Sequence, residues 1–360
     1  MGFSMPYDYH HIRINLSENA YMVMHDDMLQ FNIKNRSTFV NTIFHNFMND
    51  SKASIDCQLD NKERELYEII NSNNLGENNK LLIQALLANE ESKLVNTILK
   101  LKSKKYKSQI YYLNEDNYKA FKERSDFRYS CYKTLSQYLK CILEDYASLS
   151  YLEREKIFFH EQYLIAEQAI INEILLEVTT QNNHTFRIYP YSLDTDALST
   201  RLYLTGMSKP KHISNTTKEK YPASFRIPRL KKIKLVQTRK NGELVGRNGK
   251  LTKSEKLEIK SAISTRKIQF LVGNEEKICI RLTTQGIEMY KSLLYMRPQF
   301  DPKESTDYEF VFYCTEYQAE FYFFKFGKEV EILSPNSLRE KFKKAYKEAS
   351  IVYENTDSQL

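Results

Sequence analysis

Polar and apolar residues alternate along residues 10–16, HHIRINL, near the start of the chain. Alternation of this kind predicts a strand that buries one side and exposes the other. The apolar side comprises Ile12, Ile14 and Leu16. The opposite side carries the polar residues His11, Arg13 and Asn15, which we expect to face outward.

Two helices are predicted directly after this strand. Ser17 is a favourable N-cap for the first helix, and the apolar residues that follow it recur at helical spacing. They are Ala20, Met24, Met28 and Phe31. Residues 32–35 break this helix, and a second helix begins at Asn35. Its apolar face carries Phe39, Ile43 and Phe47.

One strand and two short helices bury too little surface to be stable alone. The simplest solution is a homodimer in which the strands of two subunits form a two-stranded antiparallel ribbon. In this order of elements, residues 9–50 resemble the ribbon-helix-helix family. The resemblance implies that the outward strand residues read bases: His11, Arg13 and Asn15. It implies phosphate contacts by Arg36, Ser37 and the amides that open the second helix.

Only Arg13 among the three strand residues is a strong base-reading cation. A ribbon that serves dimerisation alone is therefore the alternative to specific recognition of a duplex.

The rest of the chain divides into three further regions. Residues 51–172 have apolar positions every three or four residues and are predicted to be a connector that is helical throughout. Residues 173–275 contain short β-branched or aromatic runs separated by turn residues, which predicts a small β-barrel. A helix is expected within it over residues 252–263. Residues 276–360 alternate between strand and helix patterns. With the module over residues 1–50, the predicted fold class is α+β.

Charge is concentrated in one part of the chain. Residues 209–270 hold 18 Lys or Arg against 4 Asp or Glu, a local charge of +14, whereas the whole chain carries +7. Such a concentration favours a polyanionic partner. The alternative is a solvated face of loops and strands.

The five cysteines include no pair with the C-x-x-C spacing of a zinc or redox site. We expect free thiols in a reducing compartment. The N-terminal residues lack an apolar run of the secretory type, and no stretch resembles a membrane span. The sequence therefore predicts a cytoplasmic protein without membrane association.

Motifs that indicate catalysis are missing from the sequence. It contains no G-x-x-x-x-G-K-[ST], no G-x-G-x-x-G and no H-E-x-x-H. The glycines of RKNGELVGRNGK, residues 239–250, are more typical of a basic hairpin arm than of a phosphate-binding loop. We predict a non-enzymatic protein that needs no cofactor or metal.

Three motifs occur in order within residues 186–230. They are Pro190-Tyr191-Ser192-Leu193, Leu202-Tyr203-Leu204 and Phe225-Arg226-Ile227-Pro228-Arg229-Leu230. This segment resembles a WYL domain, with Leu202 in place of the Trp of the Trp-Tyr-Leu run. The stretch from Phe326 to Arg339 is similar to the cap extension that often follows WYL domains.

The WYL resemblance implies an Sm-like or SH3-like barrel whose basic, aromatic pocket binds nucleic acid or a nucleotide. Guanidinium groups match phosphate and stack on bases, and tyrosine rings add stacking surfaces. The residues implied are Tyr191, Arg201, Tyr203, Arg226, Arg229, Lys231 and Lys232. Strict alternation along a strand sends Arg226 and Arg229 to opposite faces unless Pro228 marks a bulge.

A ribbon-helix-helix module joined to a WYL domain resembles the accessory proteins of type VI-D CRISPR systems. That resemblance implies binding of single-stranded RNA and stimulation of an RNA-targeting effector nuclease, with single-stranded DNA as a further ligand. One alternative is a transcriptional regulator that reads duplex DNA through the ribbon and senses a nucleotide through the WYL domain. Another is an interaction protein whose basic segment docks an acidic partner.

Overall fold

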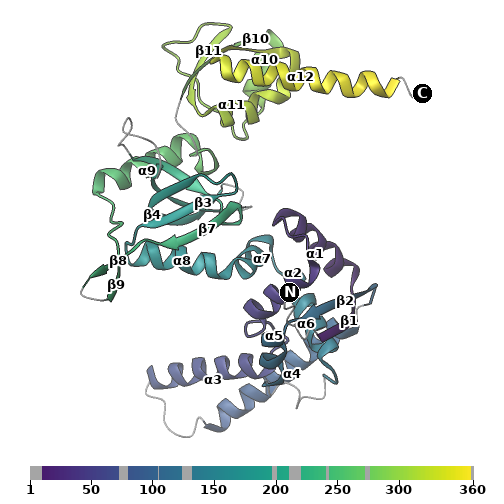
Figure 1. Cartoon of the computed structure of the whole chain (residues 1–360). Coiled ribbons are helices and arrows are strands. Elements are labelled where there is room, and N and C mark those ends of the chain that lie inside the picture. The colour runs from purple at the N-terminus through teal and green to yellow at the C-terminus, as the bar shows by residue number, and fades with distance from the viewer. Residues whose placement is uncertain are drawn as a thin grey trace, which may run out of the picture. The chain divides into compact units, whose positions relative to one another are not determined.

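Helices and strands are interspersed along the whole chain, which confirms the α+β class (Figure 1). The computed structural model describes residues 10–72, 80–103, 105–123, 132–196, 201–210, 220–240, 243–271 and 276–357. Two compact units comprise Met1–Glu161 and Gln162–Leu360. Among the described helices, none is both long enough and apolar enough to cross a membrane.

The first unit begins as the sequence predicts. β1 (His10–Leu16) is followed by α1 (Glu18–Gln30) and α2 (Arg36–Phe47). Ser17 caps α1 by accepting a hydrogen bond from the Ala20 N–H at 3.2 Å. Asn35 caps α2 by accepting one from the Thr38 N–H at 3.0 Å. The later elements are α3 (Ile55–Ser72), α4 (Lys80–Ser103), β2 (Lys107–Leu113), α5 (Glu115–Lys122), α6 (Leu135–Ser148) and α7 (Tyr151–Phe158).

β1 pairs with β2 of the same chain in antiparallel register, so that Arg13 lies opposite Ile110. Two predictions are therefore wrong: residues 51–172 are not helical throughout, and the N-terminal strand does have a partner within its own chain. The sequence of β2, KSQIYYL, is short and contains an Ile and two Tyr, residues that favour a strand. This pairing removes the reason that the sequence offered for a homodimer through the ribbon, and the dimer itself stays a prediction.

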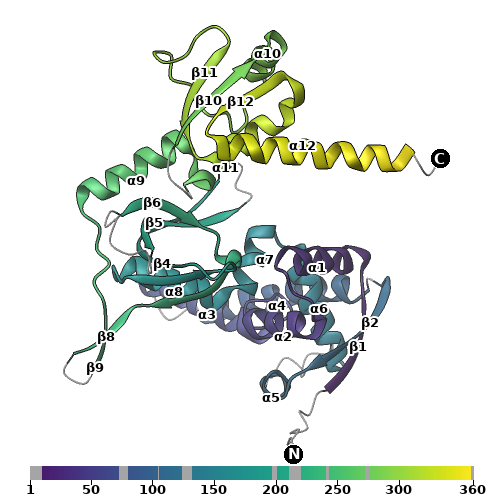
Figure 2. The same cartoon turned by 45° about the horizontal axis from the view of Figure 1, so that its top comes forward.

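The buried face of this sheet packs against helices in one hydrophobic core (Figure 2). Ile14 and Leu16 of β1, Phe39 of α2 and Tyr138 of α6 belong to it. This core therefore contains residues from both sides of the boundary suggested at residue 50. Glu144 of α6 accepts hydrogen bonds from the backbone N–H and the hydroxyl of Ser17, each at 2.6 Å, and joins the β1–α1 corner to α6.

A buried ion pair also holds this unit together. The Nε of Arg154 in α7 lies 2.7 Å from Oδ2 of the buried Asp27 in α1. The Tyr146 hydroxyl donates to the same oxygen at 2.9 Å. Burial, together with the Asp27 carboxylate, raises the pKa of Tyr146 well above its ordinary value. Because the carboxylate is satisfied on two sides, removing one donor would leave charge in the core.

The second unit contains a five-stranded antiparallel sheet in the order β6-β5-β4-β3-β7. Its strands are β3 (Leu176–Thr180), β4 (Thr185–Thr195), β5 (Leu202–Pro210), β6 (Tyr221–Phe225) and β7 (Leu230–Leu235). The edge strands β6 and β7 are joined by a 3-10 turn, η3 (Ile227–Arg229), and do not pair with each other among the described residues. The predicted barrel is therefore seen as an open sheet.

The helices and the hairpin that flank the five-stranded sheet agree with the sequence patterns. α8 (His160–Ile171) precedes the sheet, and a hairpin, β8 (Gln237–Lys240) and β9 (Glu243–Gly246), follows it. The helix predicted over residues 252–263 is α9 (Lys253–Arg266), with η4 (Ile268–Phe270) after it.

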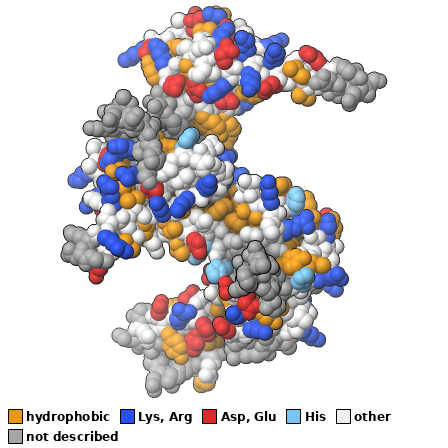
Figure 3. All heavy atoms as spheres, in the orientation of Figure 1, with side chains coloured by type: hydrophobic (Ala, Val, Ile, Leu, Met, Phe, Trp, Pro, Cys, Tyr) orange, Lys and Arg blue, Asp and Glu red, His pale blue; other side chains and the backbone are white. Residues whose placement is uncertain are grey.

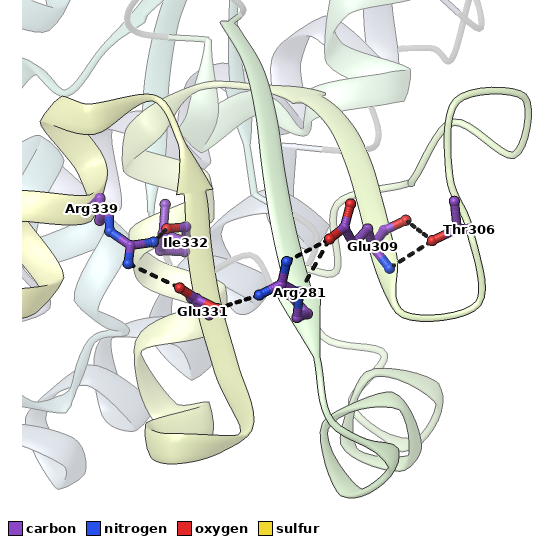
Figure 4. A network of polar contacts seen from close by, with 6 residues as sticks. All are labelled: Arg281, Thr306, Glu309, Glu331, Ile332 and Arg339. Atoms are coloured by element: carbon purple, nitrogen blue, oxygen red, sulfur yellow. Dashed lines mark hydrogen bonds and ion pairs between the residues drawn. The ribbon is translucent and has the colours of Figure 1, made fainter.

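The last part of the chain has a three-stranded sheet in the order β11-β10-β12. Its elements are β10 (Glu276–Leu282), α10 (Thr284–Ser292), β11 (Glu309–Cys314), α11 (Glu316–Phe323), η5 (Phe324–Glu329), β12 (Val330–Ser334) and α12 (Asn336–Asp357). Arg281 of β10 bridges Glu309 at 2.7 Å and Glu331 at 2.9 Å (Figure 4). Arg339 extends the row with a 2.9 Å contact to Glu331. The row links all three strands on one exposed face.

Among the described residues, four cysteines form no disulfide, as predicted: Cys57, Cys141, Cys279 and Cys314. Cys131 lies outside the described residues.

Candidate nucleic-acid interface

Tyr203 of β5 is the centre of a group of charged side chains in the second unit. Burial raises the pKa of the Tyr203 hydroxyl, and the positive charges of Arg226 and Arg229 act in the opposite sense. Both guanidinium groups therefore lie within electrostatic reach of this hydroxyl. We call Arg201, Tyr203, Arg226 and Arg229 the arginine cluster.

Arg226 and Arg229 both lie at the turn between β6 and β7. Arg226 has an extended backbone and is the N-cap of η3, whereas Arg229 is the last residue of that turn. Side chains three residues apart eclipse each other in a 3-10 turn. The sequence predicted a strand from Phe225 to Leu230, with a bulge at Pro228 as the alternative, and the structure has a 3-10 turn containing Pro228 at this place. The turn separates Arg226 from Arg229 by three residues, and the charges of both act on the Tyr203 hydroxyl.

Arg201 is fixed at the start of β5 by the buried residue Asp196. The Asp196 N–H donates to the Arg201 carbonyl at 3.2 Å, and the Arg201 N–H donates to Asp196 Oδ1 at 3.4 Å. The Asp196 charge also contributes to the raised pKa of Tyr203. Arg201 is thus held to Asp196 through its backbone, and the group of three arginines and one carboxylate carries a net positive charge.

Tyr191 lies at a β-bulge in β4, where the register with β5 shifts between Pro190 and Ser192. Its ring is half-buried and packs against the apolar cluster that contains Met207 and Ile259. Because its ring packs there, the structure gives Tyr191 a packing role beside the bulge. The backbones of β4 and β5 approach closely nearby, since a Cβ on Gly206 would lie 2.3 Å from the Tyr189 carbonyl oxygen.

Lys231 and Lys232 are exposed on β7, directly after η3. The ammonium of Lys231 donates to the side chain of Asn183 at 2.8 Å. Figure 3 shows several Lys and Arg side chains over the part of the molecule that contains this sheet. The two lysines add positive charge directly after Arg229 along the chain.

Sequence reasoning missed one aromatic residue near the cluster. Tyr317 of α11 is 54% exposed and contributes to the raised pKa of Tyr203. Its ring centroid lies 5.8 Å from that of Phe270. Tyr317 and Tyr203 are far apart in sequence, and residues 316–326 could be interpreted as strand or helix, so no local pattern indicated this contact.

Of the five predicted ribbon residues, three are exposed on β1 and two contact β2. His11, Arg13 and Asn15 are exposed on β1, as expected. Arg36 instead donates to the Gln109 side chain at 2.8 Å, and the Ser37 hydroxyl accepts from the Tyr112 N–H at 3.0 Å. The residues expected to hold phosphate at the start of α2 thus contact β2.

No protein-family model and no curated protein matches this chain. A solved structure described as a CRISPR Cas-related protein matches with a TM-score of 0.67 and 23% identity, covering 99% of this chain and 97% of that chain. The proteasome accessory factor B/C (PafBC) of Arthrobacter aurescens matches with a TM-score of 0.29 and 13% identity, over 65% of this chain and 37% of that chain. The first match shows that the fold is shared along nearly the entire chain.

Proposed function

We propose that this chain is a non-catalytic protein that binds single-stranded RNA through the arginine cluster and supports an RNA-targeting CRISPR nuclease. The observation that carries the proposal is the 3-10 turn between β6 and β7, which is flanked by Arg226 and ends at Arg229, two cations that act on the half-buried Tyr203. It lies within residues 209–270, where the local charge of +14 is found.

The chemistry of the cluster suits a single strand. A guanidinium group presents a planar fork to a phosphate and a flat face to a base, and a phenol ring offers a stacking surface. Each base–aromatic stack contributes about 1–3 kcal/mol, and such stacking tolerates any base. A duplex keeps its bases stacked inside the helix. Stacking on the tyrosine ring and the guanidinium groups therefore contributes less binding free energy with a duplex than with a single strand.

The link to a CRISPR system is supported by two separate observations. The first is the shared fold with a CRISPR Cas-related protein over 99% of this chain. The second is the resemblance of the sequence motifs to the accessory proteins of type VI-D systems. The partner nuclease would supply the catalysis.

The proposal is tested by fluorescence anisotropy with single- and double-stranded RNA and DNA of equal length, each titrated at several salt concentrations. We expect preference for single-stranded RNA, and a loss of at least about a hundredfold in the Arg201→Ala, Arg226→Ala, Arg229→Ala variant. Lys260→Gln removes one exposed cation from α9 and serves as the control. Unchanged affinity in the triple variant would remove the cluster from the binding site.

Stimulation is measured separately, as RNA cleavage by a type VI-D effector nuclease with and without this protein. The triple variant should stimulate less in proportion to its weaker RNA binding. If stimulation persists while RNA binding is lost, the accessory role does not depend on this site.

A regulator of duplex DNA is the second candidate, because one face of β1 is exposed and polar. In that case Arg13→Ala with Asn15→Ala would abolish duplex binding. The contacts of Arg36 and Ser37 with β2 weigh against it.

A further inference from the structure

A cationic hollow of about 680 Å³ lies in the first unit, between β1, the end of α4 and the start of α6. Four cations line it: Arg13, Lys102, Lys105 and Lys140. Among the described residues that line this hollow there is no Asp or Glu. We call it the lysine hollow.

The fold holds one of these charges in place. Lys140 of α6 is only 6% exposed, and its ammonium donates to the carbonyl of Lys102 at 2.9 Å, in the last turn of α4. The carbonyl end of a helix stabilises a cation. A positive charge is thus built into the wall of the hollow, which costs desolvation energy that a surface lysine would not.

Two of the other charges lie at the surface. Arg13 and Lys105 are exposed, and the backbone carbonyl of Arg13 is fixed by a hydrogen bond from the Ser136 hydroxyl. The backbone at Arg13 is therefore held while its guanidinium group remains at the surface. Lys102 is half-buried beside them.

Uncharged polar side chains complete the lining of the hollow. Thr134, Ser136 and Gln137 belong to the N-cap and first turn of α6, a helix of 14 residues, and all three line the hollow. Its N-terminal N–H groups add partial positive charge at this end. Asn15 of β1 contributes an amide. The lining therefore suits an anion with several oxygen atoms.

An aromatic surface continues from the hollow along the same face of the sheet. Arg13 lies opposite Ile110, and His11 lies opposite Tyr112 one step further along. Residues directly opposite in an antiparallel pair share a face. The His11 and Tyr112 rings lie 4.4 Å apart, edge to face, and Tyr112 is 41% exposed. A platform for an unpaired base thus adjoins a hollow for phosphates.

We propose that the lysine hollow binds the phosphates of single-stranded nucleic acid, with a base resting on Tyr112. The inference rests on the proposed function, because it adds a second contact site for the same strand. Two sites on one chain raise the affinity for a strand long enough to reach both, through effective concentration. A strand that occupies one site gains nothing from the other.

The test measures binding of the full-length protein to RNA of about 6 and about 24 nucleotides at several salt concentrations. The variant is Lys102→Gln with Lys105→Gln, which leaves the buried Lys140 intact. Lys93→Gln, an exposed residue of the same helix, is the control. Long RNA should bind about tenfold more weakly to the double variant, and the salt slope should fall by about 1.4 for two lost phosphate contacts. Tyr112→Leu should weaken binding of long RNA without changing the salt slope.

Different results separate the two sites. If the double variant matches the wild type on long RNA while the arginine-cluster variant loses binding, the hollow is not a site and the proposed function stands. If only the double variant loses binding, the hollow stands alone and the proposed function fails. Equal weakening on duplex RNA, or competition by AMP at micromolar concentration, would overturn the assignment to a single strand.

Discussion

The arginine cluster and the lysine hollow are both cationic, but they are built from different groups. The cluster combines planar guanidinium groups with a phenol ring and one buried carboxylate, Asp196. The hollow combines three lysines and an arginine, and no carboxylate among the described residues lines it. Guanidinium forks select geometry, whereas ammonium groups act as point charges. The two sites should therefore differ in how they respond to substitutions that preserve charge.

The largest expected effect is a loss of stability of the first unit, which contains the lysine hollow. The second unit, which contains the arginine cluster, should keep its stability. Arg154→Leu leaves the Asp27 carboxylate buried with one donor fewer, and should destabilise the first unit by about 3–5 kcal/mol. Thermal unfolding should show an early transition of the first unit, at a lower temperature than that of the second unit. Lys156→Gln, exposed on the same helix, is the matched control. A single unchanged transition would mean that the ion pair contributes little.

The next effect concerns RNA affinity after substitutions that keep the positive charge but change the shape of the cationic group. Arg226→Lys with Arg229→Lys should weaken binding of single-stranded RNA about tenfold or more, because the fork is lost while the charge remains. Lys102→Arg with Lys105→Arg should change the affinity by less than about twofold. Anisotropy at one fixed salt concentration compares the two pairs. Equal losses in both pairs would show that the sites recognise phosphate in the same way.

A smaller effect concerns the ring at the centre of the cluster. Tyr203→Phe keeps the stacking surface, and Tyr203→Leu removes it at the cost of about 1–3 kcal/mol of binding free energy. The ratio of the two affinities measures the stack. A ratio near one would mean that Tyr203 packs within the protein and does not contact a base.

The last expected effect is a dependence of stability on pH, at alkaline pH only. Burial raises the pKa of Tyr111, on the buried side of the β1–β2 sheet, to about 12. Its ordinary pKa is about 10, so the unfolded chain loses this proton first as the pH rises. The stabilisation is complete below about pH 10 and is lost as the pH rises to about 12. Tyr111→Phe should flatten this part of the curve of unfolding free energy against pH.

Local patterns were sufficient for many elements of the fold. The alternation along residues 10–16, the caps Ser17 and Asn35, and the strands and helices of the last part of the chain are all confirmed. In each case the information lies within one element, as a period of apolar residues or a capping side chain. β2 was missed because seven residues between two helices carry too short a period to compete with the helical spacing around them.

Local sequence patterns did not predict which distant residues form the candidate sites. The arginines of the cluster were found because they occur in short motifs, and Pro228 indicated a possible interruption of the strand between Arg226 and Arg229, but the 3-10 turn itself was not predicted. The lysine hollow joins Arg13 to residues about 90 and 127 positions later, and nothing in the sequence near any of them indicates the others.

The pairing of β1 with β2 sets the order in which the chain can fold during its synthesis. His11 meets Tyr112 across the sheet, so the first strand has no partner until more than a hundred residues have been made. Until then its apolar side chains and open backbone edge are exposed to other chains. A nascent chain that stalls before residue 107 therefore presents an unpaired strand, and release of such fragments would favour aggregation.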